Sequence, residues 1–274
     1  MDEIVPGAQP KKNDGRPFVI FGTPSLYADT GFAYDGSILQ SVALFKDEID
    51  WGCLMVPGDP YLAKVRNTIA TRFLKNFPTA THLFFIDSDL GWTPSAVRLF
   101  VESDLDVCVG VYPKKSDAVD FPCELELDKV TERVIEHPEK PGWFKARGIP
   151  TGFLCIKRHV LVKMAKGRGV YKDLDGQLRY NIFQMGFCAD VEEGAKPLFD
   201  DETGEQIGAW WGEDYAFAKQ WHDLGGSIWV YPNIDFSHCG FKAWKNNFSG
   251  SVNAYIAGNA KIRHIGEPKL EAVA

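Results

Sequence analysis

Strand-like and helix-like segments alternate along residues 18–111, and this alternation constrains the fold more than any other feature. Four short apolar runs have the length and composition of buried strands, at 18–21, 53–56, 82–86 and 107–111. Apolar residues at helical spacing lie between them, at 35–48, at 61–76 and after Pro94. Strands that alternate with helices usually pair in parallel in one sheet and bind ligands at their carboxyl ends. The sequence therefore predicts an α/β fold of the Rossmann-like type, with a doubly wound, mostly parallel sheet flanked by helices.

The second half of the chain is less regular. Alternating polar and apolar residues over 123–147 indicate a small antiparallel hairpin insertion, and the segment 167–208 looks like a long loop, which suggests a lid or acceptor-binding loop. Strands at 151–156 and 228–231, a short helix at 159–166 and a helix at 210–224 complete the pattern. We expect one domain at 18–240, a mobile segment at 1–17, and a basic, aromatic tail at 241–274 that could act as a flap.

Composition sets limits on the class of protein. The 274 residues are 45% hydrophobic and 13% aromatic, which suits one large globular domain. The net charge of −7 provides no global positive field for nucleic acid or anionic membranes. Six scattered cysteines without a CxxC pair indicate buried free thiols. No apolar run approaches the ~18 residues of a membrane span, and residues 1–16 lack the apolar core of a signal peptide, so we expect a soluble, cytoplasmic protein.

The most informative polar motif is Asp87-Ser88-Asp89, directly after the apolar run 82–86. Alternate residues of a strand point the same way, so both carboxylates can face one pocket at the sheet edge if the strand geometry continues. Carboxylate oxygens suit Mg²⁺ or Mn²⁺ shared with a diphosphate. A helix cap or a polar turn is the simpler reading of the same residues.

A histidine downstream is a further candidate metal ligand. His238 follows the apolar run 228–231 after a short loop, where a chain returning to the sheet could present an imidazole to the same cation. A histidine among aromatic residues is also commonly a hydrogen-bonded core residue. Both readings stay open from the sequence.

Two acidic residues, Glu213 and Asp214, begin the helix that we expect at 210–224. The helix dipole stabilises acidic residues at this position regardless of function. A carboxylate beside a diphosphate site is also what is needed to orient an acceptor hydroxyl and take its proton. The motif needs support from elsewhere to decide between these readings.

The order of motifs along the chain resembles that of GT-A glycosyltransferases. The motifs are Thr23-Pro24, Arg66-Asn67, Phe85-Ile-Asp-Ser-Asp-Leu-Gly-Trp92, Gly110-Val-Tyr-Pro113, Thr151-Gly-Phe153, Gly212-Glu-Asp-Tyr215 and Ser237-His238. More narrowly, the chain is similar to the nucleotide-diphospho-sugar transferases of bacterial and phage genomes, which are related to the fungal mannan-polymerase group. The resemblance extends from about residue 18 to residue 240.

The resemblance implies a role for each matching residue. Asp87 is expected to contact the donor ribose or the metal, Asp89 to bind the metal, and His238 to complete the protein ligands. A nucleotide pocket is expected at Thr23, Pro24 and Tyr27, with Arg66 reaching base or phosphate, unless Arg66 is simply a surface cation. Gly152 is expected to leave room for the donor sugar. Glu213 and Asp214 are expected to face sugar and acceptor as the catalytic acids.

These expectations define the predicted function. The protein would be a metal-dependent glycosyltransferase that uses Mn²⁺ or Mg²⁺ and a UDP- or GDP-sugar, with a glycan, a protein or, less readily, a modified DNA base as acceptor. A nucleotidyltransferase is the closest alternative, but the segment Gly22-Thr-Pro-Ser-Leu26 lacks the Gly-rich, basic phosphate loop of that class. A non-catalytic sugar- or nucleotide-binding protein of the same fold is the other. Lys114 and Lys115 could approach phosphate, although two lysines in a loop are more often only solvated.

Overall fold

The computed structural model describes residues 15–188 and 199–258. The segment 1–17 therefore lies almost entirely outside the described residues, and so does the end of the expected tail, 259–274. The first half of the chain contains β1 (Phe18–Ser25), α1 (Phe32–Phe45), β2 (Asp50–Pro57), α2 (Leu62–Asn76), β3 (His82–Ile86), β4 (Leu90–Trp92), α3 (Ser95–Glu102) and β5 (Val107–Val109). The predicted alternation of strands and helices is confirmed here.

The second half contains more strands than we expected. Its elements are β6 (Glu124–Leu125), β7 (Phe144–Gly148), β8 (Phe153–Lys157), α4 (Arg158–Ala165), β9 (Val170–Lys172), β10 (Leu178–Tyr180), β11 (Gly186–Cys188), β12 (Ala209–Trp211), α5 (Glu213–Asp223), β13 (Ile228–Val230), β14 (Asp235–Cys239), β15 (Ala243–Asn247) and α6 (Ser249–Ile256). Strands β9 and β10 form an antiparallel pair, as do β11 and β12. The described part of 167–208 is thus not a plain loop, and the helix expected from Trp210 begins only at Glu213.

The main sheet has eight strands in the order β2-β1-β3-β8-β5-β13-β7-β6. Strands β1, β2 and β3 are parallel, whereas β8 runs antiparallel to both of its neighbours, β3 and β5. Strand β13 is parallel to β5, and β7 is antiparallel to β13 and to β6. All strands except β8 and β7 therefore point the same way. The predicted Rossmann-like, mostly parallel sheet is confirmed, but two reversed strands make it mixed.

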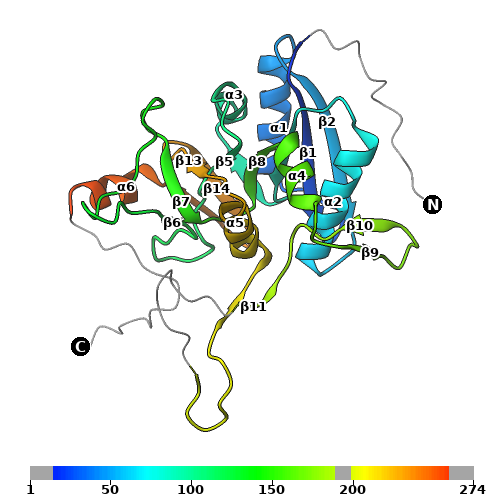
Figure 1. Cartoon of the computed structure of the whole chain (residues 1–274). Helices are drawn as coiled ribbons and strands as arrows, with labels where there is room; N and C mark the ends of the chain where they lie inside the picture. The colour runs from blue at the N-terminus through cyan, green and yellow to red at the C-terminus, as the bar shows by residue number, and fades with distance from the viewer. Residues whose placement is uncertain (1–14, 189–198, 259–274) are drawn as a thin grey trace.

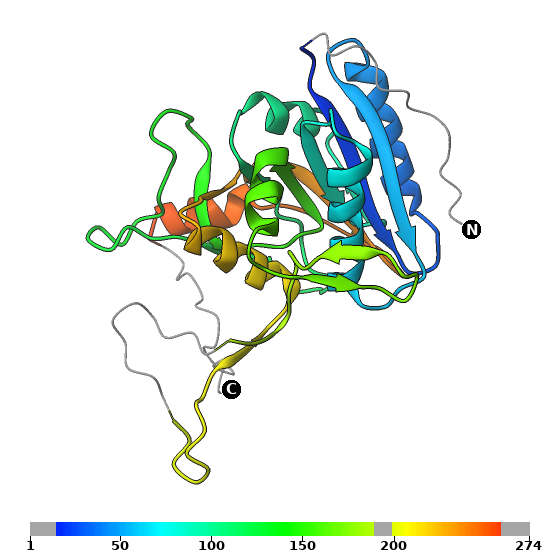
Figure 2. The same ribbon diagram turned by 45° about the vertical axis from the view of Figure 1, so that its right-hand side comes forward.

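Helices cover both faces of this sheet. Neighbouring residues of β1 and β3 alternate between two hydrophobic clusters, as the strand period of two requires. Ile20 and Leu83 pack with α2, and α4 and α5 belong to the same cluster. Val19 and Phe84 pack with α1 and α3 in the other cluster. Figures 1 and 2 show the resulting three layers, with α1 and α2 on opposite sides of β1.

Short antiparallel pairings lie at the edge of the main sheet and around it. The pair β6–β7, in the region expected to form a hairpin, extends the main sheet at its edge. The ribbon β11–β12 projects from the body (Figure 1). Strand β14 pairs with β4 and β15 in a small sheet, and Phe248 and Val252 bury the start of α6 against the core. The small sheet fixes the chain on both sides of His238.

Two further expectations concern the chain as a whole. Cys108 and Cys155 are buried, Cys53 is exposed, and all cysteines whose side chains are described are free thiols. Among the helices of the described ranges, none combines the length and the apolar character needed to cross a bilayer.

Candidate active site

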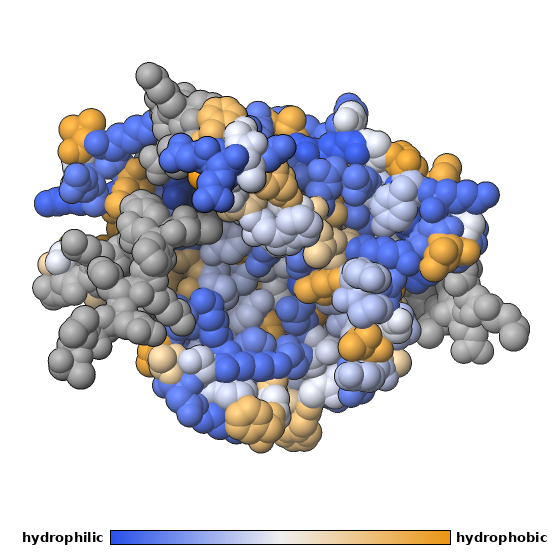
Figure 3. Space-filling model, turned by 90° about the horizontal axis from the view of Figure 1, so that it is seen from below, coloured by the Kyte–Doolittle hydropathy of each residue, from blue (hydrophilic) through white to orange (hydrophobic). Residues whose placement is uncertain are grey.

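The candidate site lies where the carboxyl ends of β1 and β3 meet the amino end of β8. The backbone N–H of Asp87, directly after β3, donates a 2.9 Å hydrogen bond to the Gly152 carbonyl, just before β8. The N–H of Gly31, at the start of α1, donates to the Ser88 carbonyl at 2.8 Å. These bonds join three connections at one sheet edge. This edge faces down in Figure 2, and Figure 3 shows that the surface seen from below is hollowed near its middle.

Arg66 is the centre of the buried part of the site. Its side chain, on α2, is 1% exposed, so Arg66 is not a surface cation. Its Nη2 donates to Asp87 Oδ1 at 3.0 Å and its Nε to Glu213 Oε1 at 3.4 Å. Its Nη1 donates to the Thr151 carbonyl at 3.3 Å, and the guanidinium lies over the Phe85 ring, 5.4 Å from its centroid. One buried cation thus joins α2, the end of β3, the start of β8 and the start of α5.

The space beside Gly152 is filled by the protein itself. A Cβ at this position would overlap with Tyr112 Oη and Asp87 Oδ2. The Gly152 N–H donates to Tyr112 Oη at 3.2 Å. Burial raises the pKa of Tyr112 well above its ordinary value, so its hydroxyl stays protonated and can act as donor and acceptor. Glycine is needed here because Asp87 and Tyr112 pack against its backbone; whether a donor sugar also lies there remains a prediction.

Asp89 and His238 lie together on the more exposed side of the site. Strand pairing aligns His238 of β14 with Leu90 of β4, and the Cys239 N–H donates to the Asp89 carbonyl at 2.8 Å. As a result His238 Nε2 lies 3.6 Å from Asp89 Oδ2. The other carboxylate oxygen, Asp89 Oδ1, is buried and has no hydrogen-bond partner among the residues that the structure describes. A buried carboxylate oxygen without a partner is costly, and a bound cation would satisfy it.

The hydrogen bond of the second ring nitrogen of His238, Nδ1, determines which nitrogen carries a proton and which one faces Asp89. Its Nδ1 lies 2.8 Å from the Pro113 carbonyl oxygen, which can only accept a hydrogen bond. Nδ1 therefore holds a proton, and Nε2 is the nitrogen directed at Asp89. Histidines that bind metals commonly donate their other N–H to a carbonyl or carboxylate in this way.

Lys115 belongs to the site through a contact with Asp89 that the sequence did not predict. Its Nζ lies 2.5 Å from Asp89 Oδ2, the oxygen that His238 faces. Partial burial alone would raise the pKa of Asp89, but His238 and Lys115 outweigh it, and the net effect is a lowered pKa. The preference for solvated lysines at 114–115 holds for Lys114, which pairs with Asp120 on the surface, but it is wrong for Lys115. The only hint in the sequence was that both lysines follow a strand that ends at the candidate site.

Glu213 and Asp214 begin α5 as expected, and they differ in their partners. Glu213 is 13% exposed and bonded to Arg66. Asp214 Oδ1 accepts the N–H of Tyr215 at 2.8 Å. Burial raises the pKa of Asp214, and the nearby Glu213 adds to the rise. A partly buried carboxylate with a raised pKa is suited to proton transfer.

The expected nucleotide-pocket residues after β1 lie in different surroundings. The Thr23 hydroxyl is buried and shares a 2.6 Å hydrogen bond with Tyr34 Oη of α1. Pro24 is buried in the β1–β2 ladder opposite Val56. Tyr27, by contrast, is 80% exposed in the loop before α1. Of these three, only Tyr27 presents its side chain freely to a ligand.

The expected metal ligands do not gather as a set of three. Within residues 15–188 and 199–258, no group of three or more His, Cys, Asp or Glu side chains is placed to hold a metal ion. Asp89 and His238 come together, whereas Asp87 is bonded to Arg66. Two donors at ~2.1 Å from one cation can be at most ~4.2 Å apart, so the 3.6 Å separation of Asp89 Oδ2 and His238 Nε2 fits a shared Mn²⁺ or Mg²⁺. The remaining ligands would have to come from substrate and water.

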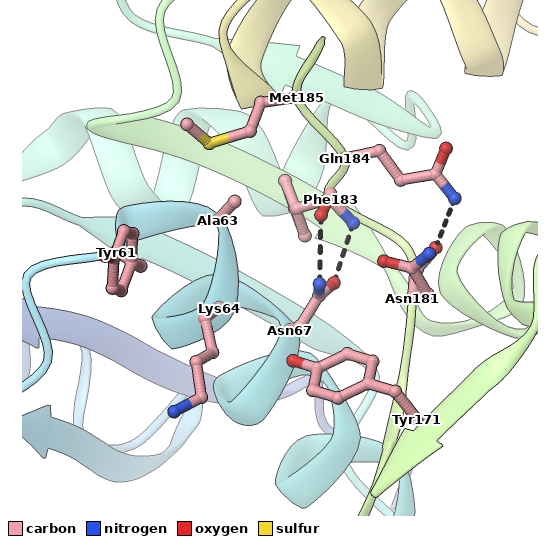
Figure 4. A pocket seen from close by; sticks show the side chains of 9 residues that line it. All are labelled: Tyr61, Ala63, Lys64, Asn67, Tyr171, Asn181, Phe183, Gln184 and Met185. Carbon is pink, nitrogen blue, oxygen red and sulfur yellow. Dashed lines mark hydrogen bonds between the residues drawn. The ribbon is translucent and has the colours of Figure 1, made fainter. Parts of the chain in front are cut away.

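A cavity of about 500 Å³ lies beside the start of α2 (Figure 4). Asn67, next to Arg66 on α2, accepts the N–H groups of Ile182 and Phe183 and donates to the Phe183 carbonyl, so it fixes the chain segment that closes the cavity. The cavity is lined by Tyr61, Ala63, Lys64, Asn67, Tyr171, Asn181, Phe183, Gln184 and Met185. Met185 precedes the ribbon strand β11, whose partner β12 leads into Glu213.

Comparison with known proteins gives distant structural similarity only. The sequence matches no protein-family model and no curated protein. The crystal structure of A197 from STIV is similar over 82% of this chain and 86% of its own, with 14% identity and a TM-score of 0.45. A glycosyltransferase involved in the glycosylation of the major capsid of PBCV-1 is similar over 54% of this chain and 63% of its own, with 10% identity and a TM-score of 0.31.

Proposed function

We propose that the protein is a glycosyltransferase that moves a sugar from a nucleoside diphosphate sugar to an acceptor hydroxyl, with a divalent cation bound at Asp89 and His238. The observation that supports this most directly is the pairing of these two residues across β4 and β14. His238 Nε2 lies 3.6 Å from Asp89 Oδ2, and His238 Nδ1–H donates a hydrogen bond to the Pro113 carbonyl. The buried Asp89 Oδ1 has no hydrogen-bond partner in the described part of the chain. A carboxylate and an imidazole with these surroundings are suitable ligands for Mn²⁺.

The proposed chemistry divides between the metal and the residues of the chain. When bound, the cation would act as a Lewis acid that stabilises the negative charge on the departing diphosphate. Arg66 holds Asp87 in place at the end of β3, where the resemblance puts the donor ribose. Asp214, at the start of α5, would orient the acceptor hydroxyl and take its proton, since burial raises its pKa. Glu213, bonded to Arg66, is better placed to fix the start of α5 than to exchange a proton.

The proposed class of donor follows from the charges at the site and the charge of the ligand. A nucleoside diphosphate is anionic, and the cation together with Lys115 would provide positive charge beside Asp89. We propose a UDP- or GDP-sugar as donor. The acceptor stays open among glycans, proteins and, less readily, a modified DNA base, because the acidic chain offers no global attraction to DNA.

Calorimetry with UDP and GDP, first in Mn²⁺ and then in excess chelator, tests the proposal. We expect binding in Mn²⁺ and a loss of at least about tenfold in affinity in chelator, and the same loss in Mn²⁺ for Asp89→Asn. Asp104→Asn is the matched control, because Asp104 also pairs with a lysine at 2.5 Å, Lys157, and lies near the start of β5, away from the site. Equal affinity in both buffers would remove the metal from the proposal. Binding of nucleoside triphosphates alone, with pyrophosphate release, would indicate a nucleotidyltransferase instead.

A screen of nucleotide sugars by thermal shift, followed by an assay for hydrolysis of the best binder, tests the transfer step. Release of free sugar in the presence of Mn²⁺ is the expected result. Tight binding of a nucleotide sugar without turnover, with any acceptor class tried, would identify the chain as a non-catalytic binding protein.

A further inference from the structure

In the metal-free protein, the side chains of Lys115 and His238 both face Asp89 Oδ2. Lys115 Nζ lies 2.5 Å from it and His238 Nε2 lies 3.6 Å from it. The lysine ammonium thus touches the same oxygen that a divalent cation shared with His238 would bind. An ammonium and a metal ion cannot both contact that oxygen at these distances on the same side without strong mutual repulsion.

The segment that contains Lys115 is attached to the strands around His238. Pro113, two residues earlier, accepts the hydrogen bond of His238 Nδ1. The stem of Lys115 passes close to Gly240, where an added Cβ would lie 3.5 Å from Lys115 Cδ. Asp117, two residues later, is paired with Lys242 and accepts a 3.2 Å hydrogen bond from Trp244 Nε1. The backbone position of Lys115 is therefore fixed, while its side chain can move.

The Lys115 side chain is free to leave because it is only partly buried. Both its side chain and that of Asp89 are 37% exposed. A lysine has a flexible four-carbon stem and a well-hydrated charge, so turning Nζ from Asp89 into solvent costs little. Arg66, at 1% exposure with three hydrogen-bond partners, has no such freedom. Of these two cations, only Lys115 is suited to exchange.

We propose that Lys115 is a built-in competitor of the divalent cation: it neutralises Asp89 in the metal-free protein and releases Asp89 Oδ2 when the metal binds. This inference rests on the proposed metal site at Asp89 and His238. Because metal binding must break the Lys115–Asp89 pair, the lysine weakens the affinity of the free protein for the metal. Its displaced ammonium then lies beside the bound cation, where an anionic diphosphate would balance both charges. Metal and nucleoside diphosphate should therefore bind with positive coupling, which the lysine strengthens.

Direct titration of the free protein with Mn²⁺, followed by the electron paramagnetic resonance of unbound Mn²⁺, tests the competition without any activity assay. Lys115→Met keeps the stem and removes the charge, and we expect it to bind Mn²⁺ about fivefold more tightly than the wild type, which corresponds to ~1 kcal/mol for a partly exposed pair. Lys114→Met is the matched control, because Lys114 pairs with Asp120 and not with Asp89, and it should leave the affinity unchanged. Asp89→Asn should abolish this binding. A second titration with UDP or GDP present, whichever binds, should show a smaller gain in affinity from nucleotide for Lys115→Met than for the wild type.

The outcomes separate the inference from the proposed function. Unchanged or weaker Mn²⁺ affinity in Lys115→Met, with binding still abolished by Asp89→Asn, would overturn the competition and leave the metal site intact. Failure of the wild type, Lys115→Met and Lys114→Met alike to bind Mn²⁺ would overturn both. Tighter binding in Lys114→Met as well would show a general charge effect, and that result too would contradict a specific role for Lys115.

Discussion

The two sides of the candidate site are built differently. On the buried side, which we call the Arg66 cluster (Arg66, Asp87 and Glu213), one guanidinium that is 1% exposed bonds both carboxylates and a backbone carbonyl. On the other side, in the Asp89 cluster (Asp89, Lys115 and His238), Asp89 and Lys115 are each 37% exposed and His238 is 15% exposed, and one Asp89 carboxylate oxygen has no hydrogen bond to any described residue. The first is complete without a ligand. The second leaves one buried carboxylate oxygen unsatisfied.

This difference distinguishes charged residues that stabilise the fold from charged residues that remain available to bind a ligand. A buried ion pair is stable only when its members are fully bonded, so the Arg66 cluster has little freedom to bind anything else. Partly exposed pairs contribute little to folding and can exchange partners with solvent ions. Acidic residues two positions apart, Asp87 and Asp89, thus fall on opposite sides of this division. We expect substitutions in the first cluster to affect stability and those in the second to affect ligand binding.

The largest effect is expected for Arg66→Met. Removing the cation leaves Asp87 and Glu213 without their buried partner, and breaking such a pair typically costs ~3–5 kcal/mol. Urea denaturation should show that loss in the free energy of unfolding. Arg98→Met is the control: Arg98 also bonds two glutamates and lies over an aromatic ring, but its side chain is 42% exposed, so a loss below ~1 kcal/mol is expected. Similar losses for both variants would contradict the contrast between the clusters.

Asp214→Asn is expected to reduce turnover by about a hundredfold while donor affinity changes little, since a positioned acid or base contributes on this scale. Asp223→Asn, at the exposed end of the same helix, should leave turnover unchanged. Donor hydrolysis measures both. If Asp214→Asn hydrolyses the donor at the wild-type rate, this carboxylate is no more than a helix cap, whose loss affects stability by ~0.3–1 kcal/mol.

In the Asp89 cluster, Asp89→Asn should change the stability of the metal-free protein by less than ~1 kcal/mol, because its ion pair with Lys115 is partly exposed and screened by solvent. His238→Ala removes a partly buried hydrogen bond to Pro113 and is expected to cost about 1 kcal/mol. Melting curves in chelator measure both values. A loss for Asp89→Asn as large as that for Arg66→Met would mean that the two sides of the site are equally structural.

The smallest expected effect is the contribution of Asp214 to the pH dependence of stability. Because the pKa of Asp214 is raised in the folded protein, the folded state binds this proton more tightly than the unfolded chain does. Its contribution to stability is therefore full below the unfolded pKa of ~3.9 and is lost as the pH rises through the folded value. Asp214→Asn should thus gain stability relative to the wild type between pH 3 and pH 7. Unfolding free energies measured across this range should show a difference that grows with pH; a constant difference would contradict the raised pKa.

Local sequence patterns predicted the elements well where the period of apolar residues was clear. The helix at 61–76 and the strand at 82–86 agree with α2 and β3 within one residue. The reversed position of β8 between β3 and β5 was missed, because strand order and direction depend on contacts between distant segments. Strands β9 to β12 were also missed: β9, β10 and β12 lie largely at the surface, whereas β5 and β13, which are equally short, are buried apolar runs and were predicted.

The sequence predicted which residues belong to the site better than it predicted how they are arranged. The idea that Asp87 and Asp89 face one pocket assumed that the strand continues, but β3 ends at Ile86 and the Leu90 N–H donates to the Asp87 carbonyl, which makes the intervening residues a turn. Each carboxylate therefore meets a different cation. Neither the burial of Arg66 nor the contact of Lys115 with Asp89 has a signature in the local sequence, because both depend on where other segments pack.

The reversed direction of β8 has a consequence for how the site tolerates mutation. Because β8 begins at this edge, the segment before it contributes main-chain groups: the Thr151 carbonyl to Arg66, the Gly152 carbonyl to the Asp87 N–H, and the Gly152 N–H to Tyr112. Replacing the Thr151 side chain removes none of these bonds. Thr151 is buried, so a side chain of similar size can replace it while the anchoring of Arg66 and Asp87 persists, whereas any side chain at 152 would collide with its neighbours. Homologous sequences should therefore exchange Thr151 only for side chains that fit the same buried space and should keep glycine at 152.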